Sequence, residues 1–132
     1  MAIFESTDRM YEVLGKLFRT LMADPVMGEK FRESKIIIRF IINDPAGQIW
    51  LDTDGNVICG TADLKPTIEM TLSGDSCHQF WLKELTLPLA LAKGKIKAKG
   101  PMPKVLKLLP MLKPAYEAYP DIAREYGLPI QS

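Results

Sequence analysis

The chain has 132 residues, of which 47% are hydrophobic and 25% charged, and its formal net charge at pH 7 is +1. These values are typical of one globular domain that is large enough to bury a hydrophobic core. No apolar run approaches the ~20 residues that a membrane-spanning helix needs, and the first ten residues lack the pattern of a signal peptide.

Two cysteines, Cys59 and Cys77, lack the spacing of a metal site or a redox motif. Their simplest interpretation is a pair of reduced thiols, which favours a cytoplasmic location. The sequence contains no metal-ligand cluster and no phosphate-binding glycine-rich loop, so we expect no cofactor and no metal.

The first part of the chain has the periodicity of helices. Apolar residues recur at intervals of three and four over residues 8–23, which predicts an amphipathic helix with Ser6 or Thr7 as its N-cap. Asp24-Pro25 then predicts the start of a short second helix that ends near Glu33.

The next part has the alternation of β-strands. Four short strands are predicted at residues 35–43, 48–53, 57–60 and 66–73, with a tight turn over residues 54–56. Their close spacing indicates an antiparallel meander. Both faces of the first strand are largely apolar, so we expect both to be covered.

Helices return after the fourth strand. Ser76 and Gln79 fit a capping box that would open a helix, and Gly94 would end a short apolar helix after Pro88. A fifth strand at residues 95–99 is expected to turn its lysines to one side. A helix is predicted to begin at Pro101 or Pro103, with one apolar stripe formed by Met102, Val105, Leu106 and Leu109.

Three prolines follow in the last part of the chain. Pro110, Pro114 and Pro120 are expected to divide it into short pieces, of which the last is a helix over residues 121–127. The whole pattern predicts an α+β fold in which a five-stranded, mostly antiparallel sheet is covered by helices.

The charge of the chain is unevenly distributed. Residues 89–109 hold six lysines and no acid, although the net charge of the whole chain is only +1. A solvated lysine face is the simplest interpretation, and docking on an anionic membrane or a phosphate headgroup is the second. Nucleic-acid binding ranks lowest because aromatic residues do not alternate with these lysines.

One stretch of this lysine-rich region resembles a family signature. The segment "ALAKGKIKAKG" matches the Ala-x-x-x-Gly-Lys-x-Lys-x-x-Gly signature of the sterol carrier protein (non-specific lipid-transfer) family, here Ala90, Gly94, Lys95, Lys97 and Gly100. The stretch "IWLDTDGN" is similar to the family's Trp-containing second strand and its hairpin, and "ADLKPTIEMTLSGDSCHQFW" is similar to its strand-to-helix segment.

The resemblance implies the domain organisation and the class of function. It covers residues 35–109 of one domain spanning residues 1–132, with N-terminal helices in residues 1–34 and a helical tail in residues 110–132. Members of this family enclose an apolar tunnel between sheet and helices, and they bind or transfer lipids, sterols or fatty-acyl groups without catalytic residues of their own. The oligomeric state stays open.

On the residues alone a filled core is the favoured interpretation of the apolar side chains, and the resemblance favours a ligand tunnel instead. The expected tunnel-lining residues are the apolar side chains on the second face of the sheet and on the helices beside the lysine-rich strand: Ile37, Ile41, Trp50, Phe80, Trp81, Leu85, Leu89, Leu91, Met102, Leu106 and Leu109. The expected headgroup-facing or membrane-facing residues are Lys95, Lys97, Lys99, Lys104 and Lys107.

Other residue pairs give weaker indications. Cys77 and His78 are neighbours on a helix and do not face each other, so an enzyme is not predicted. Cys77 is expected to be a small buried residue, and His78 a surface or helix-start residue. Arg39 and Asp52 are expected to form a cross-strand ion pair at the surface, or to hold a lipid carboxylate if that face is covered. A non-enzymatic interaction module, or an accessory subunit on the same fold with a collapsed pocket, is the alternative to a lipid carrier.

Overall fold

The computed structural model describes residues 3–130. Its helices are α1 (Thr7–Ala23), α2 (Met27–Ser34), α3 (Gly74–Trp81), α4 (Leu87–Ala92), α5 (Met102–Leu108), the 3-10 helix η1 (Leu109–Leu112) and α6 (Lys113–Glu125). Its strands are β1 (Ile38–Asn43), β2 (Gly47–Leu51), β3 (Val57–Cys59), β4 (Ile68–Ser73) and β5 (Ile96–Lys99). The predicted α+β class and the five strands are confirmed.

The strands form one mixed sheet in the order β3-β2-β1-β4-β5. β1 and β2 form an antiparallel hairpin, and β5 runs antiparallel to β4, as in the mostly antiparallel sheet that the sequence predicts. β4 instead lies parallel to β1, with Ile38 opposite Ile68 and Ile42 opposite Leu72. The predicted meander is therefore wrong at its fourth strand, because the chain after β3 crosses to the far side of β1.

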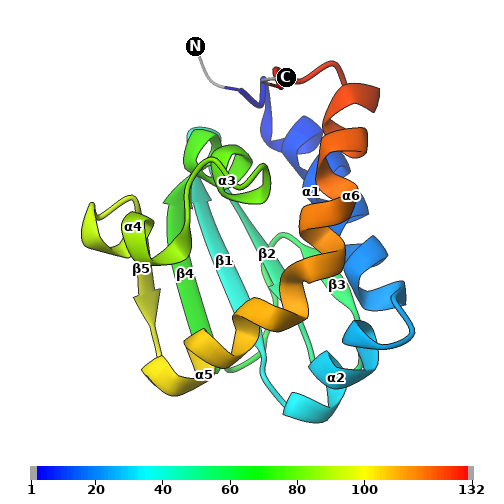
Figure 1. Ribbon diagram of the computed structural model, residues 1–132, viewed down its shortest axis with the longest axis vertical. Coiled ribbons are helices and arrows are strands. Elements are labelled where there is room, and N and C mark those ends of the chain that lie inside the picture. The colour runs from blue at the N-terminus through cyan, green and yellow to red at the C-terminus, as the bar shows by residue number, and fades with distance from the viewer. Residues whose placement is uncertain (1–2, 131–132) are drawn as a thin grey trace.

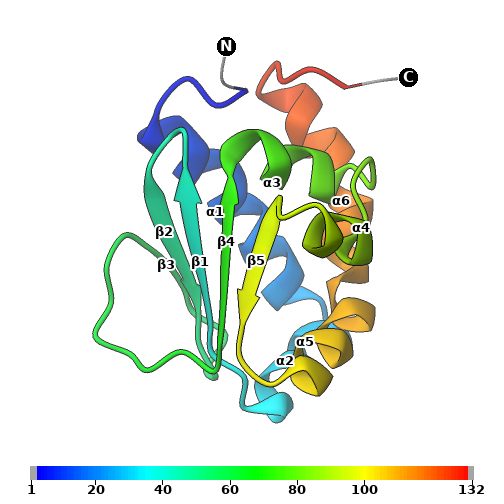
Figure 2. The ribbon, with the colours of Figure 1, turned by 90° about the vertical axis from the view of Figure 1, so that its left-hand side faces the viewer.

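All the helices lie on one face of this sheet, as Figures 1 and 2 show. The connection between β3 and β4 bows out on the opposite face (Figure 2). Alternation along β1 sets this arrangement, because Ile38, Phe40 and Ile42 are buried under the helices while Arg39 and Ile41 are half-buried on the other face. The second face of β1 carries no helix and is half-buried at Arg39 and Ile41, whereas the sequence predicts that both faces are covered.

The first helix anchors the helical layer. Ser6 is its N-cap, and the Ser6 hydroxyl accepts a hydrogen bond from the Arg9 amide at 3.1 Å, as predicted. A continuous stripe of α1 is buried: Met10, Val13, Leu14, Gly15, Leu17, Phe18, Leu21 and Met22. In α2 the Asp24 carboxylate accepts from the Met27 amide at 2.8 Å, so this helix begins two residues after Pro25.

The last helix is longer than the sequence predicts. α6 runs unbroken for 13 residues with Pro114 in its first turn and Pro120 inside it. A proline in the first turn removes an amide that has no helical partner, and only Pro120 costs an internal hydrogen bond. Packing against α1 compensates for that loss, because Ala115, Tyr119, Ile122 and Ala123 form the buried stripe of α6.

Candidate functional site

Aromatic side chains fill the centre of the layer between the sheet and the helices. The Phe18 ring of α1 stacks on Phe40 of β1 at 5.0 Å between centroids, and it meets Trp81 of α3 edge-on at 5.5 Å. Phe80 lies 4.9 Å from Trp81, and Tyr116 of α6 lies 5.6 Å from Phe80 and 5.5 Å from Trp81. Tyr116 therefore closes the aromatic cluster from the side of α6.

The edge of this cluster contains polar atoms. Trp81 is 1% exposed, and its indole Nε1 is buried without a hydrogen-bond partner among the described residues. Burial raises the pKa of the Tyr116 hydroxyl to about 12, and the Lys83 ammonium lies 5.6 Å from the centre of the Tyr116 ring. The indole N–H is a polar group inside a largely apolar part of the interior.

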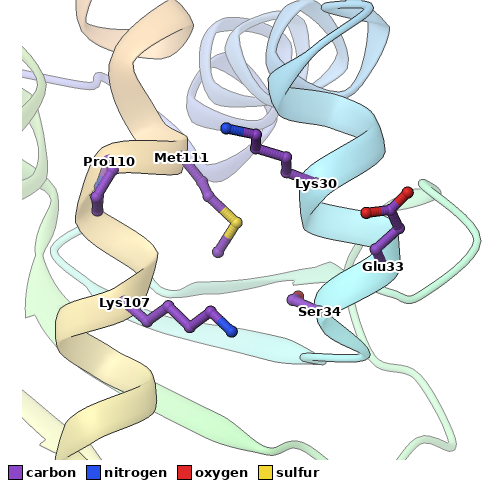
Figure 3. Close-up of a pocket in the computed structure, with 6 residues that line it drawn as sticks. All are labelled: Lys30, Glu33, Ser34, Lys107, Pro110 and Met111. Atoms are coloured by element: carbon purple, nitrogen blue, oxygen red, sulfur yellow. The ribbon is translucent and has the colours of Figure 1, made fainter.

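A groove opens between α2 and the α5–η1 segment (Figure 3). It has a volume of about 430 Å³ and is lined by Lys30, Glu33 and Ser34 on one side and by Lys107, Pro110 and Met111 on the other. Figure 3 shows the Lys107 and Met111 side chains extending from the α5–η1 side toward α2.

Met111 connects the groove with the interior. Its side chain lines the groove, yet it is only 6% exposed and belongs to the same buried cluster as Phe80 and Trp81. Two ammonium groups, Lys30 and Lys107, and one carboxylate, Glu33, surround the opening. The groove therefore combines an apolar floor with a charged rim, which suits an amphiphile whose polar end stays near water.

Five of the predicted lining residues lie in the interior layer or at its border. Phe80, Trp81 and Leu85 are buried, and Leu91 and Leu109 are partly buried against the same cluster. Four of them are in α3, α4 and η1, and Leu85 is in the loop between α3 and α4; these helices all lie on the helical side of the sheet (Figures 1 and 2).

Three other predicted lining residues belong to the opposite face of the sheet. Ile41 and Trp50 alternate with buried inward-facing neighbours, and Ile37 precedes β1 in the same alternation. Trp50 lies beside Arg39 across the β1–β2 pair and is 3% exposed. Strand periodicity alone places these side chains outside the layer between the sheet and the helices.

The last three predicted lining residues are at the surface. Leu89 is 44% exposed, Met102 45% and Leu106 51%. The sequence suggests one apolar stripe along α5, but Val105 and Leu108 are the residues that α5 buries. Met102 and Leu106, one turn apart, are consequently left on the outside of the helix.

The structure separates the five predicted lysines into two groups. Lys97 and Lys99 extend from the open face of the edge strand β5, opposite Thr71 and Glu69 of β4. Lys95 and Lys97 line a hollow of about 330 Å³ with Ser73 and Ser76.

Lys104 and Lys107 are exposed on α5, on the helical side of the sheet, and Lys107 borders the α2–α5 groove. The predicted lysine cluster is therefore two surfaces that meet at the β5–α5 edge.

On the open face of the sheet Arg39 pairs with Glu69, and not with Asp52 as predicted. Arg39 Nη1 lies 3.4 Å from a Glu69 carboxylate oxygen, and the guanidinium stacks over Trp50 at 5.3 Å. Asp52 instead accepts hydrogen bonds from the Asp54 and Asn56 amides in the β2–β3 turn. Parallel pairing with β4 brings Glu69 beside Arg39, which the predicted meander did not allow.

The only histidine is buried, although the sequence suggests a surface or helix-start position for it. His78 is 3% exposed, its Nδ1 lies 2.7 Å from the Tyr119 hydroxyl, and its Nε2 lies 2.7 Å from the Pro129 carbonyl. A carbonyl only accepts, so neutral His78 carries its proton on Nε2 and Tyr119 donates to Nδ1. Both imidazole nitrogens are engaged in holding α6 and the C-terminal segment on α3.

The first turn of α3 differs from the prediction in its N-cap and agrees with it in the burial of Cys77. Ser73, rather than Ser76, is the N-cap, and its hydroxyl accepts from the Ser76 amide at 3.0 Å. Cys77 is buried, as predicted, and burial raises the pKa of its thiol to about 12. A thiol with this pKa is a poor nucleophile at neutral pH.

Sequence reasoning missed the residues that α2 contributes to the groove. Lys30, Glu33 and Ser34 carry no motif, and their position opposite Lys107 depends on how α2 and α5 pack over the sheet. Among residues 3–130 no group of three His, Cys, Asp or Glu side chains could hold a metal ion. No helix in this range has the length and apolar character needed to cross a bilayer.

These features match a known family. The model of the SCP-2 sterol transfer family matches residues 14–113, which is most of the chain, and the protein therefore belongs to that family. The matched residues include every strand, the α2–α5 groove and the aromatic cluster except for Tyr116. No curated protein sequence matches the chain.

Solved structures show the same fold. The sterol carrier protein domain 2 of Helicoverpa armigera has a TM-score of 0.67 at 21% identity and covers 93% of this chain and 92% of its own. Sterol carrier protein 2 from Yarrowia lipolytica, in its apo form, has a TM-score of 0.62 at 21% identity, with 78% and 89% covered.

A third similar structure contains a ligand. The sterol carrier protein 2 of Aedes aegypti in complex with palmitate, a C16 fatty acid, has a TM-score of 0.60 at 18% identity and covers 80% of this chain and 94% of its own. At this identity the likeness establishes the fold.

Proposed function

We propose that this protein binds a fatty-acyl lipid between its sheet and helices and transfers it between membranes without converting it chemically. The observation that carries the proposal is the position of Met111, which belongs both to the floor of the α2–α5 groove and to the buried cluster. An acyl chain that displaces this flexible side chain would pass from the groove into the apolar interior. Each buried methylene contributes about 0.8 kcal/mol to such binding.

The proposed chain site is lined by Phe80, Trp81, Leu85, Leu91 and Leu109. The polar end of the ligand would stay at the rim of the groove, where Lys30 and Lys107 are available to an anionic headgroup. The palmitate complex of the Aedes relative supports an acyl ligand. The two free cysteines support a reducing, cytoplasmic setting.

The first experiment is native mass spectrometry of the freshly purified protein, followed by organic extraction and identification of lipids. We expect a co-purifying fatty acid or phospholipid near one per chain. A protein that stays unliganded, and whose mass no added fatty acid, acyl-CoA or sterol shifts, would contradict the proposal.

Variants test whether the acyl chain passes Met111 on its way from the groove into the interior. Met111→Trp is expected to block this passage and to lower palmitate binding at least tenfold. The control Met27→Trp, on α2 outside the groove, should leave palmitate binding unchanged.

A second set of variants tests the lysines at the rim of the groove. The double variant Lys30→Gln/Lys107→Gln is expected to weaken palmitate binding more than binding of hexadecanol, which lacks the carboxylate. Lys65→Gln in the β3–β4 connection is the matched control. Equal losses for both ligands would reject a headgroup role for these lysines.

The second candidate function is an interaction module with a collapsed pocket. Dense filling of the interior favours it, since Phe80 is 4% exposed and Trp81 1% exposed. This candidate predicts that no lipid binds and that Met111→Trp changes nothing except stability.

A further inference from the structure

We infer that the outer side of α4 and α5 is a surface that inserts into anionic phospholipid membranes. Three large apolar side chains are exposed on these two helices, Leu89, Met102 and Leu106, with exposed fractions of 44%, 45% and 51%. None of the three lines a cavity described above. This inference deepens the proposed lipid-transfer function, but it concerns a different surface and is tested separately.

The exposed apolar residues lie within the part of the chain that is strongly basic. Residues 85–116 contain seven lysines and no Asp or Glu. Among the described residues, none of the lysines between Lys93 and Lys107 takes part in an ion pair. Their positive charge is therefore available to a partner outside the chain.

The exposed apolar side chains and the lysines lie on neighbouring elements, α4 and α5. Met102 and Leu106 are one turn apart on the outer side of α5, and Lys104 and Lys107 are exposed on the same helix. Leu89 is on α4, which packs against β5. Figures 1 and 2 show α4 and α5 on the same edge of the molecule, at the two ends of β5.

A lipid bilayer fits this combination best. Leucine and methionine enter the hydrocarbon boundary, while each lysine near an anionic surface adds about 1 kcal/mol of attraction. A second copy of the chain would bring two lysine-rich surfaces together, which is unfavourable. Nucleic-acid phosphates would attract the lysines but give the leucines no partner.

This docking orientation would bring the ligand entrance to the membrane. α5 carries the exposed Met102 and Leu106, and its Lys107, with Pro110 just beyond it, forms one wall of the α2–α5 groove. Insertion of the outer side of α5 would thus place the groove near the headgroups.

The test uses the full chain and co-sedimentation with vesicles of phosphatidylcholine, with or without phosphatidylserine. The wild type is expected to bind only the phosphatidylserine vesicles, and less as salt is added. The double variant Met102→Ser/Leu106→Ser is expected to bind at least tenfold more weakly. The control Val26→Ser/Leu64→Ser removes two exposed apolar side chains elsewhere and should bind like the wild type.

A fluorescence measurement tests insertion directly. In a Cys59→Ser background, Leu106→Cys carries an environment-sensitive dye, while Cys77 is buried and stays unlabelled. Phosphatidylserine vesicles should shift the emission to the blue, and the same dye at Leu64→Cys should not respond. Binding that depends on salt but leaves the Leu106 dye unshifted, or wild-type binding by the serine variant, would overturn the inference.

Palmitate loading of the same serine variant separates this inference from the proposed function. We expect loading to be normal, because Met102 and Leu106 lie outside the groove. Absence of fatty acid, acyl-CoA and sterol binding in both proteins, with vesicle binding intact, would reject the carrier proposal and leave the docking surface standing. If the variant instead loses a protein partner and keeps its vesicle binding, the surface is a protein interface and the inference is wrong.

Discussion

The two glycines of the lysine-rich signature, Gly94 and Gly100, are required for different physical reasons. Gly94 has a φ of +71°, and a Cβ there would meet nothing within 4 Å. Gly100 has a φ of +131°, and a Cβ there would lie 2.6 Å from the Thr67 carbonyl oxygen. The first glycine supplies a left-handed turn, and the second also permits close contact with the start of β4.

We therefore expect the two alanine variants to differ. Gly94→Ala should lower the free energy of unfolding by about 1 kcal/mol, and Gly94→Asn by less, because asparagine tolerates the left-handed region. Gly100→Ala should cost at least twice as much, since both its backbone angle and its contact are unfavourable. Urea unfolding measures the difference, and equal costs would contradict this account of Gly100.

A buried thiol on α3 and two tyrosine hydroxyls on α6 predict that the free energy of unfolding falls at alkaline pH. Burial raises the pKa of Cys77 from 9.0 to about 12 and that of Tyr116 from 10.0 to about 12, and it raises the pKa of Tyr119 as well. The unfolded chain loses these protons first, so the folded state is destabilised as pH rises from about 9 to about 12.

The contribution of the thiol can be isolated. Over that whole interval Cys77 is worth about 4 kcal/mol. Unfolding free energies between pH 8 and pH 11 should consequently fall less steeply in Cys77→Ala than in the wild type. Cys59→Ala, which removes the more exposed thiol, is the control; desolvation raises the pKa of Cys59 as well, but the change in slope should be smaller than for Cys77→Ala. Identical slopes for all three proteins would show that Cys77 is not protected in the folded state.

At the scale of elements, α6 determines how closed the interior is. Its Tyr116 contacts both Phe80 and Trp81, and its Tyr119 bonds to His78 on α3. Tyr116→Ala is expected to lower the free energy of unfolding by about 2 kcal/mol and to speed palmitate loading several-fold. Stopped-flow loading with a fluorescent fatty acid measures this, with Tyr116→Phe as the control that keeps the ring. Slower loading in the alanine variant would mean that α6 does not cover the entry path.

Local patterns predict most elements but not all of their partners. The periodicity of α1, the Asp54-Gly55-Asn56 turn and the alternation of β4 are each contained in a few consecutive residues, and the structure confirms them. The parallel β1–β4 pair, the groove formed by α2 and α5, and the continuity of α6 through Pro120 depend on contacts between distant segments. Burial of the candidate lining residues could accordingly be predicted where it follows from one element, as at Phe80 and Trp81. It could not be predicted where a second element decides which side of a helix faces inward, as at the exposed Leu106.

On the scale of the whole molecule, charge is divided between surfaces. Residues 85–116 carry a charge of +7, and the net charge of +1 leaves −6 for the rest of the chain. The basic part contains α4, β5 and α5. Away from it, positive and negative charges are paired, as Lys16 of α1 is with Glu125 of α6. An approaching anionic surface would orient this molecule before contact, because the attraction is confined to one edge.

The two ends of the described chain lie together. The Ile3 amide donates to the Asp75 carboxylate of α3 at 2.8 Å, and the Pro129 carbonyl accepts from His78 on the same helix. Ile3 and Ile130 even border one hollow, and Figure 1 places both ends at the top of the molecule and α5 at the bottom. The domain is thus suited to circular permutation and to insertion into a longer polypeptide, since a short linker could join its ends. A protein fused at either end would stand away from α5, so such a fusion would act as a tether without hiding the basic, apolar edge.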